Sequence, residues 1–379
     1  MPLMLDEQQT MLRESVRDFL AQEAPVSHLR QLRDQRHADG LSLPLWRQFG
    51  YMGYAGTLLP ESQGGLALGH ADAAIIMEEL GRHLTPSPFW STAVLGVTAL
   101  RAGNREAQQH VHLPGMGTGE TVAALALEER AKHDPAGVSL QARRQGHHFL
   151  LDGTKTFVVN GHIADVLIVV ARTGAATSGT DGLTLFLVDP KAPGVRIERS
   201  WMVDSHNAAR VHFEQVSVAE EAVLGEVDQG WRVLEPVLLA GRAAVAAELV
   251  GLGDEVFNRT LGYLRERVQF GRRIGEFQAL QHRAARVYAQ LELARAAAMK
   301  AAWALDQQDA HRSLWVSVAK AKAGCAATLA VQEAVQMHGG MGVTEELDIG
   351  LFMKRARVLD ETLGDHRFHA HQVALHHGY

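Results

Sequence analysis

Apolar residues recur at helical spacing in two parts of the chain, near its N-terminus and throughout its C-terminal part. Residues 11–20 show this spacing after an acidic start at residues 6–7, which suits a helix N-terminus. Three long runs rich in Ala, Leu and Arg follow later, at residues 243–268, 278–305 and 312–337. Because these residue types have high helix propensity, the pattern predicts N-terminal helices and a C-terminal helical bundle.

A different pattern occupies the middle of the chain. Residues 149–151 form a short apolar run that leads into Asp152-Gly153, a strong hairpin signal, and residues 157–159 form the next run. Further short runs cover residues 165–171, 183–188, 195–198 and 210–218. Because these strands follow one another without helices between them, they predict an antiparallel sheet rather than a Rossmann sheet. The expected fold class is α+β, with a helical domain over 1–115, a middle antiparallel β-domain over 116–226 and a C-terminal bundle over 227–379.

Composition narrows the class of protein. The 379 residues include 43 acidic and 37 basic side chains, and the formal net charge of −6 argues against a nucleic-acid-binding surface. The single cysteine, Cys325, excludes an intrachain disulfide, and its small-residue helical surroundings predict a buried thiol. The N-terminus lacks a secretory signal, and no apolar run approaches the roughly 20 residues that span a bilayer. We therefore expect a cytoplasmic protein with no membrane span.

Local motifs exclude several kinds of site. No GxGxxG, P-loop, HExxH or GxSxG is present, and the C-terminal histidines lack ligand spacing, so no metal site is expected. Two glycine-bearing segments, 267–274 and 336–342, each end a long predicted helix. One interpretation is that the glycines are helix C-caps. The other is that they let backbone amides approach a ligand, while Arg and Gln side chains bind its phosphate and its polar edges.

Several fragments together resemble the acyl-CoA dehydrogenase family, nearly from end to end. Pro60–Leu66 and Glu78–Arg82 resemble that family's N-terminal loop and following helix, and Asp152–Gly161 resembles its G-x-K-x-W-I-T-N strand. The C-terminal fragments that match in order and spacing are Arg267–Gly271, Phe277–Gln278 and Gln336–Gly340. The resemblance implies an N-terminal helical domain, a middle β-domain and a C-terminal four-helix bundle. It also implies FAD bound between the β-domain and the bundle, with a partner subunit completing the site.

The same resemblance gives individual residues cofactor roles. Phe157 takes the position of an aromatic side chain that lies against the isoalloxazine ring. The residues that match contacts to the FAD of a neighbouring subunit are Arg267, which would meet the pyrophosphate, Gln269, Phe270 and Gln278. The residues that match the segment around the adenosine end are Gln336, Gly339 and Gly340. Shared sites of this kind imply at least a dimer, and the family usually forms tetramers.

Members of this family oxidise an acyl-CoA thioester to the trans-2-enoyl-CoA, with electron-transfer flavoprotein or a similar acceptor as partner. A carboxylate removes the α-proton while hydride leaves the β-carbon for the flavin, and hydrogen-bond donors stabilise the developing enolate. Both usual places for this carboxylate are non-acidic here, because Leu363 stands in one and Gly241 in the other. Val159 also replaces a threonine of the strand motif, and the loop 128–137 lacks the family's serine near the flavin.

Three explanations for the missing carboxylate stay open. In the first explanation the base has moved to another acidic residue. Asp365 is the leading candidate, although it also fits a solvated turn. The further candidates are Glu235, Asp360 and Glu361. In the second the chain is one subunit of a heteromeric enzyme, because residues 338–347 resemble small subunits of bacterial two-subunit dehydrogenases of the pimeloyl-CoA type. Related two-subunit enzymes act on steroid side-chain CoA esters. In the third the chain is a flavin-dependent monooxygenase or oxidase on the same fold.

We expect an FAD-dependent acyl-CoA dehydrogenase of fatty acid or steroid side-chain catabolism. Its assembly is expected to be a homo- or hetero-oligomer, as a dimer of dimers, with the heterotetramer favoured by the missing base. A catalytically silent structural subunit is the non-enzymatic alternative. The length of the acyl chain is not assigned, because the inward faces of the bundle helices set it.

Overall fold

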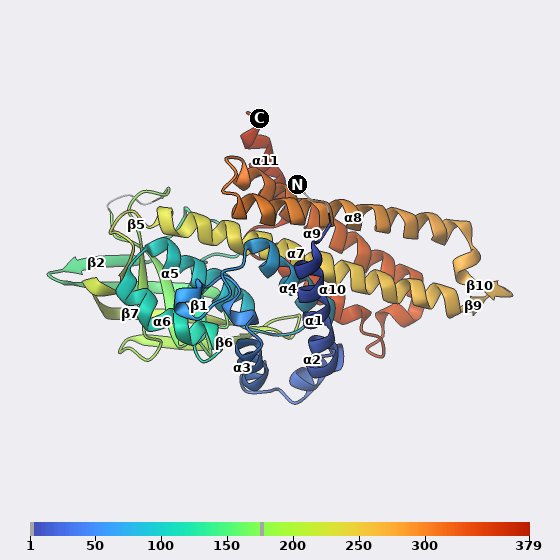
Figure 1. The fold of residues 1–379 in the computed structure, drawn as a ribbon, viewed down its shortest axis with the longest axis horizontal. Helices are drawn as coiled ribbons and strands as arrows, with labels where there is room; N and C mark the ends of the chain where they lie inside the picture. The colour runs from blue at the N-terminus through green and yellow to red at the C-terminus, as the bar shows by residue number, and fades with distance from the viewer. Residues whose placement is uncertain (1–3, 175–177) are drawn as a thin grey trace. The chain divides into compact units, whose positions relative to one another are not determined.

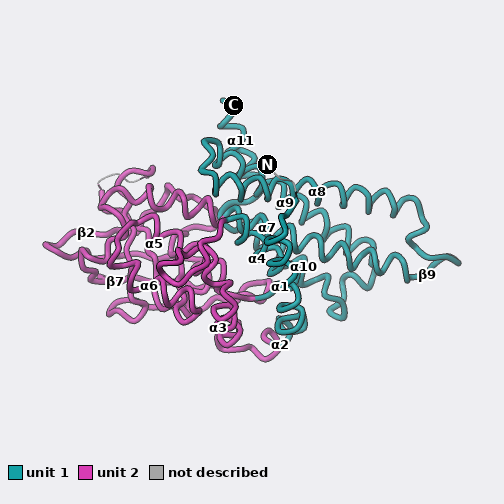
Figure 2. The backbone as a smooth tube through the Cα atoms, in the orientation of Figure 1, with its two compact units in different colours: residues 1–31, 70–85, 242–379 teal, residues 32–69, 86–241 magenta. Residues whose placement is uncertain are grey.

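The computed structural model describes residues 4–174 and 178–379 of the chain. They divide into two compact units whose segments alternate along the sequence (Figures 1 and 2). Unit 1 contains residues 1–31, 70–85 and 242–379, and unit 2 contains residues 32–69 and 86–241. Each unit is therefore assembled from segments that lie far apart in the sequence.

Unit 1 consists mainly of helices. Its first helix, α1 (Glu7–Glu23), begins where the acidic start predicts, because the Asp6 carboxylate caps it by accepting from the amide of Gln9. The other helices with most of their length in this unit are α4 (His70–His83), α7 (Trp231–Glu266), α8 (Gln278–Asp306), α9 (Arg312–His338), α10 (Ile349–Glu361) and α11 (His366–His376). Short elements complete it: β9 (Val268–Gln269), β10 (Arg272–Arg273), η5 (Ile274–Glu276) and η6 (Gly339–Val343). Helix α2 (Val26–Asp34) passes from unit 1 into unit 2.

The packing of α4 on α7 depends on two glycines. A Cβ atom on Gly81 would lie 2.1 Å from the carbonyl oxygen of Glu248, and a Cβ on Gly251 would lie 1.8 Å from that of Glu78. Non-bonded atoms do not approach so closely, so the two backbones meet only because both positions are glycine. The crossing fixes α4 against the bundle although about 170 residues separate the two segments.

Unit 2 is built on an eight-stranded sheet with the order β6-β7-β3-β2-β4-β5-β8, and β1 pairs with β4. The strands are β1 (Ala123–Ala126), β2 (Gln141–Gln145), β3 (His148–Val159), β4 (Val166–Arg172), β5 (Leu183–Val188), β6 (Val195–Trp201), β7 (Asn207–Ala219) and β8 (Val223–Leu224). Its helical elements are α3 (Leu43–Tyr51), η1 (Tyr54–Gly56), η2 (Glu61–Gln63), η3 (Phe89–Gly96), α5 (Val97–Gly103), α6 (Glu106–Gly117) and η4 (Glu220–Ala222).

The sheet is mostly antiparallel, with two parallel pairings that the strand pattern does not predict. Both β1 and β2 run parallel to β4. The chain leaves β1, forms the β2–β3 hairpin and then returns as β4 beside β1, so the connection between the two neighbours is a crossover rather than a turn.

The hairpin predicted at Asp152-Gly153 is wrong. Strand β3 runs from His148 to Val159, and the turn that precedes it contains Gly146 at a φ of +60°. Gly153 has a φ of +144°, and the register of β3 against β7 shifts next to it. Glycine therefore makes a β-bulge at the position where its sequence context predicts a turn.

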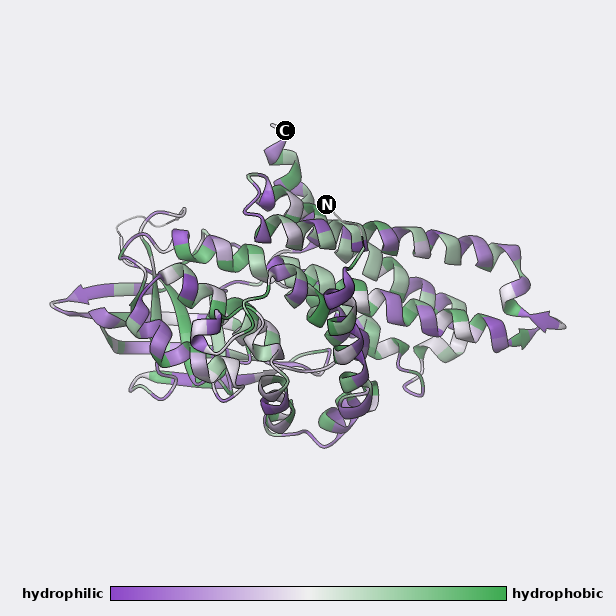
Figure 3. Cartoon of the chain, in the orientation of Figure 1, coloured by the Kyte–Doolittle hydropathy of each residue, from purple (hydrophilic) through white to green (hydrophobic). Residues whose placement is uncertain are grey.

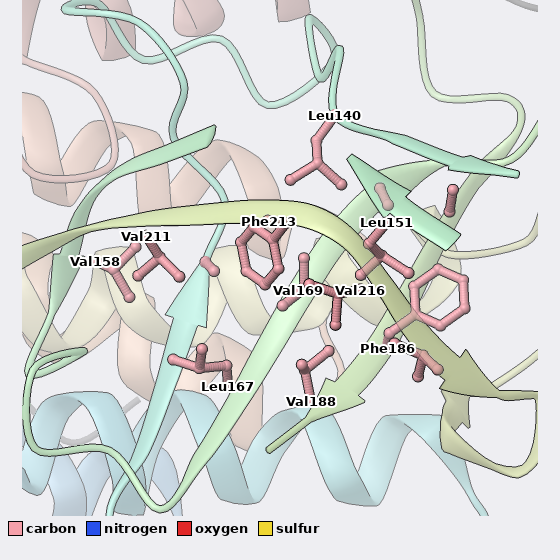
Figure 4. Packing of buried hydrophobic residues seen from close by; sticks show 14 of the residues in the cluster. Leu140, Leu151, Val158, Leu167, Val169, Phe186, Val188, Val211, Phe213 and Val216 are labelled. Carbon is pink, nitrogen blue, oxygen red and sulfur yellow. The ribbon is translucent and has the colours of Figure 1, made fainter. Parts of the chain in front are cut away.

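The hydrophobic core of unit 2 lies on the sheet, and Figure 4 shows its side chains converging from several strands. Phe149 of β3 and Phe186 of β5 meet edge to face with ring centroids 5.1 Å apart. Leu167 and Val169 of β4 and Phe213 of β7 complete the centre of the cluster. Because each fully buried large apolar side chain contributes roughly 1.5–3 kcal/mol, this cluster holds the strands in register.

Two sequence-based predictions about helix α9, on its apolar length and on the burial of its cysteine, differ from the structure. The stretch Arg312–Val343 is long and apolar enough to cross a membrane by length and composition, and 56% of its most apolar window is buried within the protein. Core helices of soluble proteins pass the same test.

Cys325 of the same helix, predicted to be buried, is exposed. In an alanine-rich helix the composition does not reveal which face is covered, and Cys325 lies between the buried residues Ala323 and Ala326.

Candidate functional site

The ends of α7 and α9 lie together in unit 1. The Tyr263 ring stacks on the His338 ring with centroids 4.3 Å apart, and the Tyr263 hydroxyl donates to the His338 carbonyl oxygen over 3.5 Å. Burial lowers the pKa of His338, so its imidazole is favoured in the neutral form. Tyr263 precedes Arg267 by four residues and His338 precedes Gly339. The two glycine-bearing segments predicted to bind a cofactor are therefore neighbours in space.

The first of these segments forms a tight hairpin, β9–β10. Its central residues, Phe270 and Gly271, have φ values of +54° and +78°, and Gln269 pairs with Arg272. Two consecutive positive φ values are typical of a type I′ turn. Phe270 is 90% exposed at the tip, and the hairpin is strongly hydrophilic in Figure 3. Phe270 is therefore a large aromatic side chain that a constrained turn holds in solvent.

The second segment offers open backbone. Gly339 ends α9 with a φ of +60°, and neither Gly339 nor Gly340 has a neighbouring atom within 4 Å of an added Cβ. Gly339 thus combines the two sequence interpretations, because it caps the helix and leaves its backbone accessible. Gln336 is exposed one turn earlier, and Gln278 is exposed at the first position of α8. Together with the exposed Arg267, these groups provide a cation, two amide side chains and free backbone.

Phe157 belongs to unit 2, where it lies at the second register break of β3. Its φ is +51°, and the pairing of β3 with β7 shifts between Lys155 and Val158. The break leaves the Phe157 ring 58% exposed. The amide of the preceding Thr156 donates to the Glu128 carbonyl oxygen over 2.7 Å. The loop that begins at Glu128 is thereby fixed beside Phe157.

Two adjacent glutamates in that loop have different partners. Glu129 accepts hydrogen bonds from the Lys155 ammonium at 2.8 Å, from the amides of Ser139 and Leu140, and from the Ser139 hydroxyl. Burial lowers the pKa of Lys155 to about 8 despite the opposing charge of Glu129. Glu128 instead hydrogen-bonds His133. Sequence reasoning assigned no role to Lys155, although a lysine at an inward-facing position of a strand is a signal for such a buried pair.

The segment around Leu363 is held by the side chains of Lys320, Arg242 and His369. The Lys320 ammonium donates to the carbonyl oxygens of Leu359, Asp360 and Gly364 at 2.8–3.0 Å. Arg242 Nε donates to the Leu363 carbonyl at 3.2 Å, and His369 Nε2 lies 3.1 Å from the same oxygen. Leu363 itself is buried at a φ of +53°. A buried leucine thus occupies a backbone position that is fixed by hydrogen bonds from three directions.

The candidate acidic residues nearby have structural partners. The Asp365 carboxylate caps α11 by accepting from the Phe368 amide at 2.7 Å. Asp360 is buried and lies 2.8 Å from His366 Nδ1. Glu361 pairs with Arg357 on the surface. In unit 2, Glu235 is exposed and the Gly241 carbonyl accepts from Trp90 Nε1.

Within residues 4–174 and 178–379, no group of three or more His, Cys, Asp or Glu side chains is arranged to hold a metal ion. The chemistry that the described groups can supply is therefore that of hydrogen-bond donors, cations and exposed aromatic rings around an anionic, polar-edged ligand.

Comparisons with known proteins agree with this description. Three sequence families match in order: "Acyl-CoA dehydrogenase, N-terminal domain" over residues 6–120, "middle domain" over 123–216 and "C-terminal domain" over 228–376. The mitochondrial isovaleryl-CoA dehydrogenase of Pongo abelii is 31% identical over 364 residues, which is 94% of this chain and 85% of that protein.

Solved structures show the same likeness. A glutaryl-coenzyme A dehydrogenase in complex with glutaryl-CoA is 28% identical with a TM-score of 0.90, over 100% of this chain and 96% of that one. A variant of the steroid acyl-CoA dehydrogenase Tcur3481-Tcur3483 is 30% identical with a TM-score of 0.86, over 97% of each chain.

Proposed function

The chain belongs to the acyl-CoA dehydrogenase family, and from this premise we propose that it is one subunit of a heteromeric, FAD-dependent acyl-CoA dehydrogenase whose catalytic carboxylate comes from another chain. Members of this family are FAD-dependent oxidoreductases. The observation that carries the proposal is Leu363, which is buried on a segment fixed by Lys320, Arg242 and His369. An aliphatic side chain in that place cannot accept the α-proton.

The residues present fit FAD at the end of the bundle. Arg267 is the cation that would meet the pyrophosphate, and the open backbone at Gly339 and Gly340 admits a ligand that a Cβ would hinder. The amides of Gln269, Gln278 and Gln336 would bond polar edges of the cofactor, and Phe270 would cover part of it. By the family resemblance, Arg267, Gln269, Phe270 and Gln278 would contact the FAD of a neighbouring subunit, whereas the exposed Phe157 of unit 2 would lie against an isoalloxazine ring and shield it from water. When bound, FAD supplies the hydride acceptor for the β-carbon of the substrate.

The substrate class we propose is an acyl-CoA thioester from fatty acid or steroid side-chain catabolism. The likeness to a steroid enzyme named after two proteins supports steroid side-chain catabolism as the source and an assembly of two different chains, which we propose to be a heterotetramer. Electron-transfer flavoprotein or a similar acceptor would reoxidise the flavin. We also propose that the protein is located in the cytoplasm.

Purification tests this function directly. The chain is expressed alone and together with candidate partner chains, and the visible flavin absorbance of each preparation is recorded before anaerobic addition of an acyl-CoA. We expect flavin in the assembled protein and rapid bleaching only when the partner is present. A preparation that stays colourless with added FAD would exclude the FAD role, and rapid bleaching by the chain alone would exclude the need for a second chain. Oxygen consumption with reduced flavin would favour a monooxygenase or oxidase.

Arg267 provides a test of cofactor binding. We expect Arg267→Gln to weaken FAD retention by about 10- to 100-fold, because a charge-assisted hydrogen bond contributes about 1.5–3 kcal/mol. The matched control is Arg265→Gln, two residues earlier and also exposed in the last turn of α7. Equilibrium dialysis of FAD measures both variants. Equal retention by the two variants would remove Arg267 from the cofactor site.

Asp365 provides a test of the moved base. We expect Asp365→Asn to leave the rate of flavin bleaching unchanged, because asparagine caps a helix as well as aspartate does and the carboxylate here serves as the cap of α11. Asp365→Ala removes the cap and should lower the free energy of unfolding by about 1 kcal/mol. A strong loss of bleaching in Asp365→Asn, with stability unchanged, would instead identify Asp365 as the base.

A further inference from the structure

A cavity of about 110 Å³ opens in unit 1 between the N-terminal residues, α4, α7 and α8. Its wall is mostly apolar and includes Leu5, Ile75, Ala298, Met299 and Trp303. None of these residues belongs to the segments assigned to FAD or to the Leu363 segment. The cavity is therefore a feature of the fold that the proposed dehydrogenation does not use.

Four polar side chains also line the cavity, and their charges do not cancel. Glu78 pairs with Arg295, and burial raises the pKa of Glu78 even against the charges of Arg295 and Arg82. Arg295 also lies 3.3 Å from Asp254, so its charge is shared between two carboxylates. The third polar group, Gln9, donates its amide to Asp72 at 3.3 Å.

Arg13 is the fourth polar group, and it is the lining cation that remains. Among the described residues Arg13 has no acidic partner, and its Nε–H is buried without a hydrogen-bond acceptor. A buried guanidinium nitrogen without an acceptor is costly, and a carboxylate matches the guanidinium group in both charge and shape.

The volume limits the size of a ligand. A cavity of about 150 Å³ in another protein accommodates benzene, so about 110 Å³ suits an alkyl group of roughly three to five carbons. We propose that this cavity binds a short-chain carboxylate, with its alkyl group against Ile75, Met299 and Trp303 and its carboxylate paired with Arg13. The site is separate from the proposed acyl-CoA chemistry and does not depend on it.

Butyrate is the probe. Ligand-observed NMR on the full-length protein should show saturable binding with a dissociation constant on the order of 1 mM, as expected for a ligand of this size. Arg13→Gln should weaken binding at least tenfold, and Ala298→Leu, which fills the cavity, should abolish it. The control is Arg286→Gln, on an exposed part of α8 outside the cavity, which should bind butyrate like the wild type.

Two further ligands separate the apolar and ionic contributions. 1-Butanol should bind more weakly than butyrate because it lacks the charge, and butylamine should not bind because it repeats the charge of Arg13. Circular dichroism confirms that each variant is folded, and Arg13→Lys, which keeps the charge, should retain part of the affinity. Absence of saturation in the millimolar range, or equal binding by wild type and Arg13→Gln, would overturn the proposal.

Discussion

Replacing Leu363 with glutamate is expected to create a base in this chain and to raise the rate of acyl-CoA-dependent flavin reduction by on the order of 10²–10⁴-fold, the usual contribution of a positioned general base. The backbone there is already fixed, because Arg242 and His369 both contact the Leu363 carbonyl oxygen and Lys320 binds the carbonyls on either side. A new side chain would therefore extend from a defined position. The measurement is anaerobic stopped-flow bleaching of the FAD-loaded chain without a partner.

The matched control for this gain is Leu363→Gln. Glutamine has nearly the same size and polarity as glutamate but cannot accept the α-proton, so it should show no increase. If Leu363→Glu folds, retains FAD and bleaches no faster than Leu363→Gln, then this position does not face the substrate. The heteromeric proposal would then lose the observation on which it rests.

Replacing Lys320 with methionine is expected to lower the free energy of unfolding by about 3 kcal/mol or more. The ammonium group is fully buried and serves three carbonyl oxygens, and each buried carbonyl left without a donor costs about 1–3 kcal/mol. Lys322→Met is the control on the same helix, because Lys322 is partly exposed and donates to the side chain of Gln290, so its loss should cost no more than about 0.5 kcal/mol. Urea denaturation compares the two. Equal losses would show that the Lys320 contacts contribute nothing specific.

The pH dependence of the Lys320 effect has a defined sign. Burial lowers the pKa of Lys320 from 10.5 to about 8 in the folded protein. Between these two values the unfolded chain binds a proton at this lysine that the folded chain does not, so the free energy of unfolding contains a contribution that rises with pH. The methionine variant lacks that contribution. The difference in stability between wild type and variant should therefore widen as the pH rises from about 8 to about 10.5, and a constant difference would contradict the assigned burial of the charge.

Long periodic segments were predictable from the sequence, and contacts between distant segments were not. The three C-terminal helices appear within a few residues of the predicted ranges, except that α7 begins at Trp231. The sequence Asp152-Gly153 led to a wrong prediction of a hairpin turn, because glycine occurs in β-bulges as well as in turns. Only the pairing of β3 with β7 distinguishes a bulge from a turn at this position. Lys320 gave no local signal, since its carbonyl partners lie 39–44 residues away.

In the candidate site, too, some features were predictable from the sequence and others were not. The segments proposed to bind the cofactor stood out by residue type and by family resemblance. The Tyr263–His338 stack, which no local pattern predicts, brings two of them together. The non-acidic residues Leu363 and Gly241, on which the proposal of a missing base rests, were visible in the sequence. The structural role of Asp365 was not, because a helix cap and a catalytic carboxylate look alike until the Phe368 amide is seen to donate to it.

The glycine crossing of α4 and α7 has a consequence for how the chain folds during synthesis. All of unit 2 has been synthesised once the chain reaches residue 241. The residues of α7 that pack against Gly81 and Glu78 of α4 are Glu248 and Gly251, and they are synthesised later. Because domains fold as their last residues emerge, unit 2 can complete its sheet while α1 and α4 still lack the helices that cover them. The newborn chain therefore passes through a state in which a finished middle carries two uncovered helical segments.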